Sequence, residues 1–418
     1  MERKFRTIRK GFDYRRCDDF AVYLNHMARL GWHFKEWRAG LVFEKGEPEE
    51  AVYAVEVFTD ATEYDTRPEP NTQEFAEYCE AAGWQFIDAK RKFCIFKRLR
   101  PDALPIMTDE ERFHSIVKAS QKDIFYAVFY GFIWVAMRLG DFNMRFERYI
   151  FSDTHIVLTA VWLLLLGMAL LRLVLFLSWK FRCKKRLDEK KSLFFGKGRQ
   201  TYANGWYNYL YSGVFLIMLL SLFLEGETWG LVTVLLVIGI INLGSYLIAR
   251  VRPDAVTNQI IQTVGSMVLL VIVFIVMLGF TVFDDDPKDP QPQPPLTYAD
   301  MGMDLDLERI SHTDRLDGWF GSWTYFNLDY GQEYLYYNVY ETEYDWVLEE
   351  VWARETEGKV NETRDDCTAT WDAQEAFRNN AGNYLVRYEN VVWVICPSLK
   401  ESLTSEQIDA VIAALKEG

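Results

Sequence analysis

The chain has 418 residues, of which half are hydrophobic and 16% are aromatic, and its formal net charge is −14. A chain of this length ordinarily forms two or three domains, and its acidity gives no reason to expect direct nucleic-acid binding. Its hydrophobic residues gather into long runs in the middle of the chain, so we expect a membrane protein with a soluble domain on either side of the runs.

The first 115 residues contain one short pattern twice. Residues 27–34 read MARLGWHF and residues 81–86 read AAGWQF. Before each glycine, Gly31 and Gly83, apolar residues recur every three or four positions, which predicts an amphipathic helix that ends at the glycine. After each glycine the apolar residues alternate, which predicts a pair of adjacent strands.

We therefore predict a duplicated β-α-β-β domain over residues 1–115, with two helices on one continuous sheet. Its shared core is expected to contain the aromatic residues that follow the glycines: Trp32, Phe34, Trp84 and Phe86. We interpret the repeat mainly as a means of covering one sheet with two helices. The alternative is that a ligand groove lies between its halves. The basic start MERKFRTIRK is not followed by an apolar stretch, so we expect no signal peptide and a cytosolic domain.

The segments FAVYLNHMARLGWHF, LVFEKGEPEEAVYAVEVF and AEYCEAAGWQF resemble the cytosolic module of an uncharacterised bacterial membrane-protein family, domain of unknown function 2812. The resemblance covers about residues 1–120 and depends on the M-A-x-x-G-W pattern and on its spacing to the second Gly-Trp. It implies a cytosolic head on a membrane anchor. Because genes of the family often lie beside genes for PadR-type transcriptional regulators, it also implies a regulator system as the partner. It implies no catalytic residue.

Five apolar runs follow, and a helix that crosses a bilayer needs about 20 apolar residues. We predict a transmembrane domain over residues 121–283, with spans at about 122–140, 156–178, 206–225, 229–248 and 260–282. The first run is shorter and includes Arg138, so a buried soluble helix is the alternative for that run alone. No Asp, Glu or His lies at mid-depth, which disfavours ion-coupled transport, and Arg172 is expected to snorkel toward the following loop.

Loop charges set the expected orientation. The loop between the second and third runs is strongly basic, which is typical of the cytoplasmic face and of contact with anionic lipid headgroups. Its basic residues include Lys180, Arg182, Lys184, Lys185, Arg186, Lys190 and Lys191. The next turn is acidic, the one after it is basic, and the chain leaves the fifth run through an acidic stretch. We therefore expect a multi-pass protein of the bacterial cell membrane with a cytoplasmic N-terminus and an extracytoplasmic C-terminus.

Residues 284–296 are rich in proline and acidic side chains and are predicted to be a linker. Residues 297–418 are predicted to form an exported α+β domain with aromatic strands, a short helix in TWDAQEAFRNN and a C-terminal helix in LTSEQIDAVIAALKEG. Because this domain is exported, we predict a disulfide between Cys367 and Cys396, with two buried free thiols as the alternative. Its aromatic side chains are either a recognition surface or core and strand-face residues.

No histidine or cysteine spacing typical of a metal site is present, and neither a phosphate-binding loop nor a serine-hydrolase elbow occurs. We therefore expect no cofactor, no metal and no enzymatic activity. Two soluble domains on opposite faces of a membrane favour a signalling or regulatory protein, whose exported domain binds an external ligand or partner and whose cytosolic domain engages a cytosolic partner. The alternatives are an accessory or structural subunit of a membrane transport complex and, less favoured by five featureless spans, an uncoupled channel or transporter.

Overall fold

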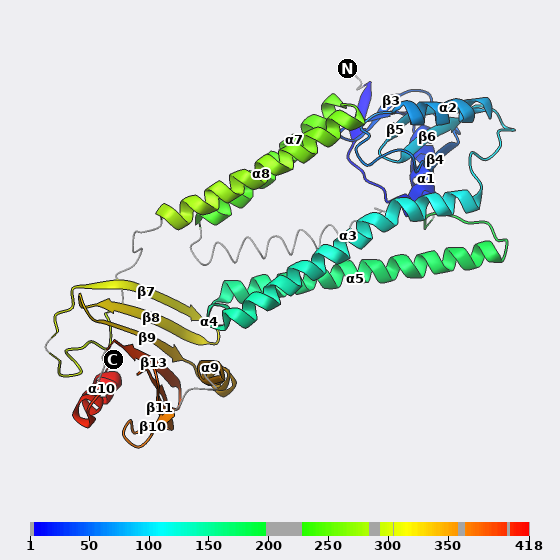
Figure 1. Cartoon of the computed structure of the whole chain (residues 1–418). Helices are drawn as coiled ribbons and strands as arrows, with labels where there is room; N and C mark the ends of the chain where they lie inside the picture. The colour runs from blue at the N-terminus through cyan, green and yellow to red at the C-terminus, as the bar shows by residue number, and fades with distance from the viewer. Residues whose placement is uncertain are drawn as a thin grey trace. The chain divides into compact units, whose positions relative to one another are not determined.

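The computed structural model describes residues 4–197, 228–283, 293–303, 305–357, 364–398 and 402–417. The chain divides into two compact units (Figure 1). The first unit comprises Met1–Val135 and Val161–Val282, and the second comprises Ala136–Ala160 and Phe283–Gly418. Helices α3 (Asp109–Met144) and α5 (Asp153–Asp188) therefore contribute residues to both units. The span predicted at 206–225 lies outside the described residues.

The N-terminal part of the first unit consists of two β-α-β-β repeats. The first contains β1 (Phe5–Ile8), α1 (Cys17–Arg29), β2 (Trp32–Trp37) and β3 (Leu41–Lys45). The second contains β4 (Tyr53–Val57), α2 (Pro70–Ala81), β5 (Trp84–Lys90) and β6 (Phe93–Arg98). Each repeat forms an antiparallel sheet with its last strand in the middle, in the orders β1-β3-β2 and β4-β6-β5. The predicted α+β duplication is present, whereas the prediction of one continuous sheet is wrong.

The chain passes from helix to strand at Gly31-Trp32 and at Gly83-Trp84, called here the Gly-Trp joints. Both joints have the geometry that the pattern predicts. Gly31 and Gly83 have φ angles of 75° and 96°, in the left-handed region that favours glycine at the end of a helix. A Cβ atom at Gly31 would lie 2.7 Å from the carbonyl oxygen of Gly46, so this position also requires the absence of a side chain. Each joint therefore turns the chain directly from its helix into a strand.

The aromatic residues after the glycines do not share one core. Phe34 is buried in a large cluster with α1, and Trp32 packs against that cluster. Trp84 is buried in a smaller cluster with α2, and Phe86 packs against it. The predicted common core is therefore wrong, because each pair packs under its own helix.

The second sheet is covered on both faces. Along β6, Phe93 and Ile95 belong to the α1 cluster, whereas Cys94 and Phe96 belong to the α2 cluster. Successive side chains of a strand point to opposite faces, which explains this alternation. Helix α1 thus packs against both repeats.

The core of the first repeat extends beyond the predicted boundary at residue 115. It also contains side chains from the start of α3, the end of α5 and the segment after α5: Phe113, Ile116, Val117, Ala119, Ile124, Phe176, Leu193 and Phe195. The residues Lys180–Arg186, predicted to lie in a loop, belong to helix α5 instead. The end of the second apolar run is therefore part of the core of the first repeat, because Phe176 is buried there.

Among the residues that the structure describes, α3 and α5 are long and apolar enough to cross a membrane. They pack together through stacked Trp134 and Trp162 rings, whose centroids are 4.9 Å apart, and Gly131 allows close approach of Leu166. A shorter apolar stretch, Leu235–Val251, forms most of α7 (Thr228–Val251), which is followed by α8 (Ala255–Phe283).

The second unit contains a seven-stranded antiparallel sheet in the order β10-β11-β12-β13-β9-β8-β7. Its elements are β7 (Arg309–Gly318), β8 (Gly321–Asp329), β9 (Tyr334–Glu341), α9 (Asp345–Glu357), β10 (Arg364–Asp366), β11 (Glu375–Asn379), β12 (Tyr384–Arg387), β13 (Val391–Pro397) and α10 (Ser405–Glu417). The short helix predicted in TWDAQEAFRNN is wrong, because those residues form a turn and then β11. The predicted C-terminal helix is present as α10 and begins with a capping box, in which Thr404 and Gln407 exchange hydrogen bonds of 2.9 and 3.3 Å.

Each face of this sheet has its own core. One core contains Ile408 and Val411 of α10 together with Leu296, so the last residue of the predicted linker is buried in the domain. The other core contains α9 and α4 (Phe146–Ile150), the short helix between α3 and α5. The C-terminal domain therefore includes a segment that lies far outside its predicted range of 297–418.

The predicted disulfide is absent. Neither Cys367 nor Cys396 is joined in a disulfide, and Cys396 is buried. Cys367 packs against the α10 core, whereas Cys396 lies in the α9 core on the other face of the sheet. Since Cys396 directly follows Ile395, which faces α10, strand alternation directs its sulfur away from Cys367.

Candidate ligand-binding cavity

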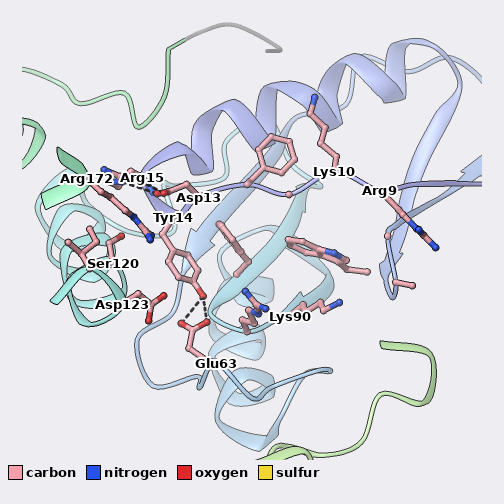
Figure 2. Close-up of a pocket in the computed structure, with 18 residues that line it drawn as sticks. Arg9, Lys10, Asp13, Tyr14, Arg15, Glu63, Lys90, Ser120, Asp123 and Arg172 are labelled. Carbon is pink, nitrogen blue, oxygen red and sulfur yellow. Dashed lines mark hydrogen bonds and ion pairs between the residues drawn. The ribbon is translucent and has the colours of Figure 1, made fainter. Parts of the chain in front are cut away.

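A cavity of about 540 Å³ opens in the first unit beside the first repeat (Figure 2). Its walls come from the connection between β1 and α1, the β2–β3 and β5–β6 turns, Glu63, and residues of α3 and α5. The lining residues are Arg9, Lys10, Gly11, Phe12, Asp13, Tyr14, Arg15, Trp37, Ala39, Gly40, Glu63, Lys90, Arg91, Phe93, Ser120, Asp123, Ile124 and Arg172. This volume suits a small organic ligand.

Two of the three acidic side chains of the cavity are already engaged. Asp13 accepts hydrogen bonds of 2.9 and 2.8 Å from the guanidinium of Arg15. Burial opposes the charge of Asp13, but Arg15 outweighs it and lowers the pKa of the Asp13 carboxyl. Tyr14 donates its hydroxyl to both carboxylate oxygens of Glu63, at 2.9 and 3.0 Å. The third acidic residue, Asp123, is exposed.

Cationic side chains outnumber these carboxylates. Figure 2 shows Arg9 and Lys10 pointing away from Tyr14, while Arg172 extends from α5 toward it. Among the described residues, neither Arg172 nor Arg91 forms an ion pair or hydrogen bond through its side chain. The cavity therefore has positive charge that its own carboxylates do not neutralise.

Lys90 adds to this charge from the end of β5. Its ammonium donates to the carbonyl oxygen of Arg38 at 2.6 Å and lies 5.7 Å from the ring centroid of Trp37. Burial, together with the neighbouring guanidinium groups of Arg91 and Arg252, lowers the pKa of Lys90 to about 8. The positive charge of Lys90 is thus held in an environment that disfavours it.

The β5–β6 turn holds these cations in place through an unusual backbone conformation. Arg91 has a φ angle of 53°, which residues with a side chain adopt rarely. Its backbone N–H donates to the carbonyl oxygen of Asp65 at 2.7 Å, which secures the turn against the loop before α2. Strained conformations of this kind are often found at ligand sites.

The hydroxyl of Ser120 is the most informative polar group in the cavity. Ser120 lies on α3 and is only 8% exposed, yet its Oγ atom has no hydrogen-bond partner among the described residues. A buried hydroxyl in a native structure is almost always hydrogen-bonded. Figure 2 shows Ser120 on the same side of the cavity as Arg172 and Asp123.

Aromatic rings also line the cavity. Tyr14 and Phe93 have ring centroids 4.6 Å apart, and Trp37 lies 5.8 Å from Phe93. The rings pack against the α1 core and present flat surfaces beside the cationic groups. Such a wall can stack against a planar part of a ligand.

Two polar networks attach helix ends to this unit. Arg112, near the start of α3, donates to Glu56 at 2.9 Å and to Asp18 at 2.5 Å. The other carboxylate oxygen of Asp18 accepts from the backbone N–H of Phe195 at 2.6 Å, and Asp19 accepts from that of Lys197 at 3.0 Å. The first turn of α1 therefore holds both the start of α3 and the segment after α5.

The second network lies on the second repeat. Arg252, in the turn between α7 and α8, donates to the carboxylate of Asp88 at 2.8 Å and to the carbonyl oxygen of Thr66 at 2.7 Å. Asp88 also accepts from the backbone N–H of Trp37 at 2.6 Å. The turn between α7 and α8 is thus bound to β5, close to the cavity wall.

The residues singled out from the sequence lie elsewhere. None of Gly31, Trp32, Phe34, Gly83, Trp84 and Phe86 lines the cavity, and neither do the basic residues of the α5 end, Lys180, Arg182, Lys184, Lys185, Arg186, Lys190 and Lys191. Arg172, whose side chain was expected to snorkel toward the loop that follows the second apolar run, lines the cavity instead. A partial signal was present in KGFDYRR at residues 10–16, where charged and aromatic residues are interleaved. Among the described residues no group of His, Cys, Asp and Glu could hold a metal ion.

These features define the first unit as a duplicated α+β domain attached to long apolar helices, with a cationic cavity beside them. Residues 17–129 match the model of the family described as a protein of unknown function, DUF2812. The matched range covers most of both repeats and the first part of α3, so the N-terminal part of the chain is a DUF2812 domain. Searches of curated proteins and of solved structures found no match.

Proposed function

We propose that the chain is a multi-pass protein of the bacterial cell membrane with a signalling or regulatory role. In this proposal the N-terminal domain lies in the cytosol and engages a cytosolic partner, and the C-terminal domain lies outside and binds an external ligand or partner. The observation that carries the proposal is the attachment of three helix ends to the N-terminal domain. They are the start of α3, the segment after α5 and the α7–α8 turn.

This attachment agrees with the charges of the sequence. The end of α5 and the α7–α8 turn are the two basic connections, and basic connections favour the cytoplasmic face. The α3–α5 turn contributes Phe146 and Ile150 to the core of the C-terminal domain. Helices that cross the bilayer would therefore put the two domains on opposite faces, and the five predicted spans satisfy this alternation.

Reporter fusions test the topology. A reporter that needs export should be active when fused after Phe283, and a reporter that needs the cytosol should be active when fused near Lys190. A further fusion near Asp254, in the α7–α8 turn, should behave as the one near Lys190. The opposite result at any of these sites would contradict the topology.

Co-purification tests the regulatory role. The full chain, solubilised from membranes, should recover a cytosolic protein that is lost when residues 1–115 are deleted. Deletion of residues 297–418 is the matched control and should leave this recovery unchanged. If no cytosolic protein depends on residues 1–115, the signalling role loses its main support.

The alternative is an accessory or structural subunit of a membrane transport complex. The same attachments of helix ends would then serve to hold a stable bundle against transporter subunits. Recovery of permease or ATPase subunits with every version of the chain, including the one without residues 1–115, would favour this alternative.

A further inference from the structure

We infer that the cavity beside the first repeat binds a small phosphorylated anion through Arg172, Lys90, Arg91 and the hydroxyl of Ser120. The regulatory meaning of this binding rests on the proposed function, whereas the binding itself does not. The ligand would be either a soluble phosphorylated metabolite or the headgroup of an anionic phospholipid, since both present the same phosphate oxygens.

The first argument is the charge of the cavity. Asp13 pairs with Arg15 and Glu63 accepts from Tyr14, and the cationic side chains that line the cavity outnumber its carboxylates. Lys90 donates to a carbonyl oxygen and lies beside an aromatic ring. A phosphate group accepts hydrogen bonds from arginine in paired geometry and would supply the missing negative charge.

The second argument is the unsatisfied hydroxyl of Ser120. A helical serine ordinarily donates to the carbonyl oxygen one turn earlier or is exposed to water. Ser120 is buried, has no hydrogen-bond partner in the part of the chain that the structure describes, and lines the cavity on the side of Arg172. A phosphate oxygen in the cavity would accept its hydrogen, and neither an apolar ligand nor a cation could do so.

The third argument is the combination of volume and aromatic surface. A cavity of about 540 Å³ is larger than a phosphate ion, so the ligand carries an organic group beside its phosphate. Tyr14, Trp37 and Phe93 offer that group a wall of rings. The basic residues at the end of α5 lack such a wall and are exposed, so they attract anions without selecting among them.

Binding would also connect the helices to the repeats. Ser120 is on α3 and Arg172 is on α5, whereas Lys90 ends β5 of the second repeat and Arg91 follows it in the β5–β6 turn. A ligand held by all four residues would stabilise the arrangement of these elements that the structure shows. Its concentration would then bias the attachment of the helix ends, which is the coupling that a regulatory domain needs.

The test uses the full chain in a zwitterionic detergent, with inorganic pyrophosphate and adenosine monophosphate as soluble probes. We expect at least one probe to raise the melting temperature in proportion to its concentration. Arg172→Gln and Arg91→Gln should each weaken binding about tenfold or more, because a hydrogen bond to a charged group is lost. The matched control, Arg182→Gln, changes an exposed arginine on the same helix and should alter affinity less than about twofold.

A second arm separates the two sources of phosphate. The chain is placed in nanodiscs of phosphatidylcholine, with or without phosphatidylglycerol. Stabilisation by phosphatidylglycerol that is lost in Arg172→Gln but kept in Arg182→Gln identifies a lipid headgroup, and stabilisation by soluble probes alone identifies a metabolite. The side chain of Arg91 is exposed, so Arg91→Gln should keep the melting temperature of the ligand-free protein and remain interpretable if Arg172→Gln does not fold.

Two results would overturn the inference. One is the absence of stabilisation by pyrophosphate, adenosine monophosphate and phosphatidylglycerol alike. The other is an equal loss in Arg182→Gln and in the cavity variants, which would indicate general attraction of anions. Either result would leave the reporter fusions and the co-purification unaffected, so failure of this inference can be distinguished from failure of the proposed function.

Discussion

The two β-α-β-β repeats share a strand order and a Gly-Trp joint, but their helices have different surroundings. In α1, eight of 13 residues are buried, whereas in α2 only three of 12 are buried, and Tyr78 of α2 is 71% exposed. Helix α1 packs against both sheets and against the helices that follow, and α2 covers one face of one sheet. The two repeats therefore share one topology, but among the described residues only the first packs against both sheets and the following helices.

The polar residues of the repeats differ in the same way. The first turn of α1 binds the start of α3 and the segment after α5 through Asp18 and Asp19. The second repeat binds the α7–α8 turn through Asp88. The second repeat also binds the start of α3, because Glu56 of β4 accepts from Arg112. The comparison can be tested by removing these attachments or by replacing the glycines at the ends of α1 and α2.

The largest effect is expected at Arg112. Replacement by methionine leaves the buried Glu56 and the half-buried Asp18 without their cation, so Arg112→Met should lower the free energy of unfolding by about 3–5 kcal/mol. The measurement is alkylation of the buried Cys17 in the full chain during heating. Arg29→Met is the control, because its pair with Glu50 is exposed and contributes less than about 1 kcal/mol. Similar losses in both variants would contradict the central role of the first repeat.

A smaller effect should separate the two joints. Gly31→Ala introduces a Cβ atom 2.7 Å from a backbone oxygen in a left-handed conformation, and we expect a loss of about 2–4 kcal/mol. At Gly83 the nearest atom, at 2.8 Å, belongs to the flexible side chain of Arg100, so Gly83→Ala should cost about 1–2 kcal/mol. Thermal unfolding of the two variants side by side checks this order. A larger loss at Gly83 would show that the second joint is the more constrained one.

The smallest effect concerns pH. Burial raises the pKa of Glu56 to about 7, from a usual value of 4.5, even though Arg112 donates to this carboxylate. Between these values the folded state keeps a proton that the unfolded state releases. The contribution of this carboxyl to stability is therefore full below pH 4.5 and is lost as the pH rises toward 7.

Glu56→Gln removes this titration. The difference in stability between the wild-type chain and Glu56→Gln should change by about 1–3 kcal/mol between pH 4.5 and pH 8, with the wild type losing more as the pH rises. Comparing both proteins at each pH cancels the effect of pH on the labelling reaction. A constant difference across this range would mean that Glu56 is ionised throughout, as a carboxylate fully stabilised by Arg112.

The sequence predicted those features that depend on neighbouring residues. The positive φ angles at Gly31 and Gly83 and the strand pair after each glycine follow from local patterns, and so does the cap formed by Thr404 and Gln407. The sequence did not reveal that the six strands form two separate sheets. The alternation of apolar residues shows that a segment is a strand, but it does not show which other strand it pairs with. Helix α9 was also missed, since DWVLEEVWARETE lies beside tyrosine-rich strands and was not read as a separate element.

The cavity could not be predicted because its residues come from segments far apart in the sequence. Arg172 in an apolar run is compatible with snorkelling to water and with insertion into a protein cavity, and only tertiary structure decides between them. The error at Cys367 and Cys396 has a similar cause. Export and loop length favoured a disulfide, but the register of β13 decides which face each sulfur occupies, and the register was unknown.

The contribution of α4 to the C-terminal core has a consequence for how the protein is made. Phe146 and Ile150 pack with Trp323, which the ribosome adds roughly 180 residues later, a delay on the order of 10–40 s. Throughout that interval the apolar side of α4 has no partner from its own sheet, because β8 and β9 have not yet been synthesised. Residues 297–418 produced alone would expose the matching surface of Trp323, Tyr340 and Val392. A fragment intended for biophysical work therefore needs residues 142–151 supplied on the same chain.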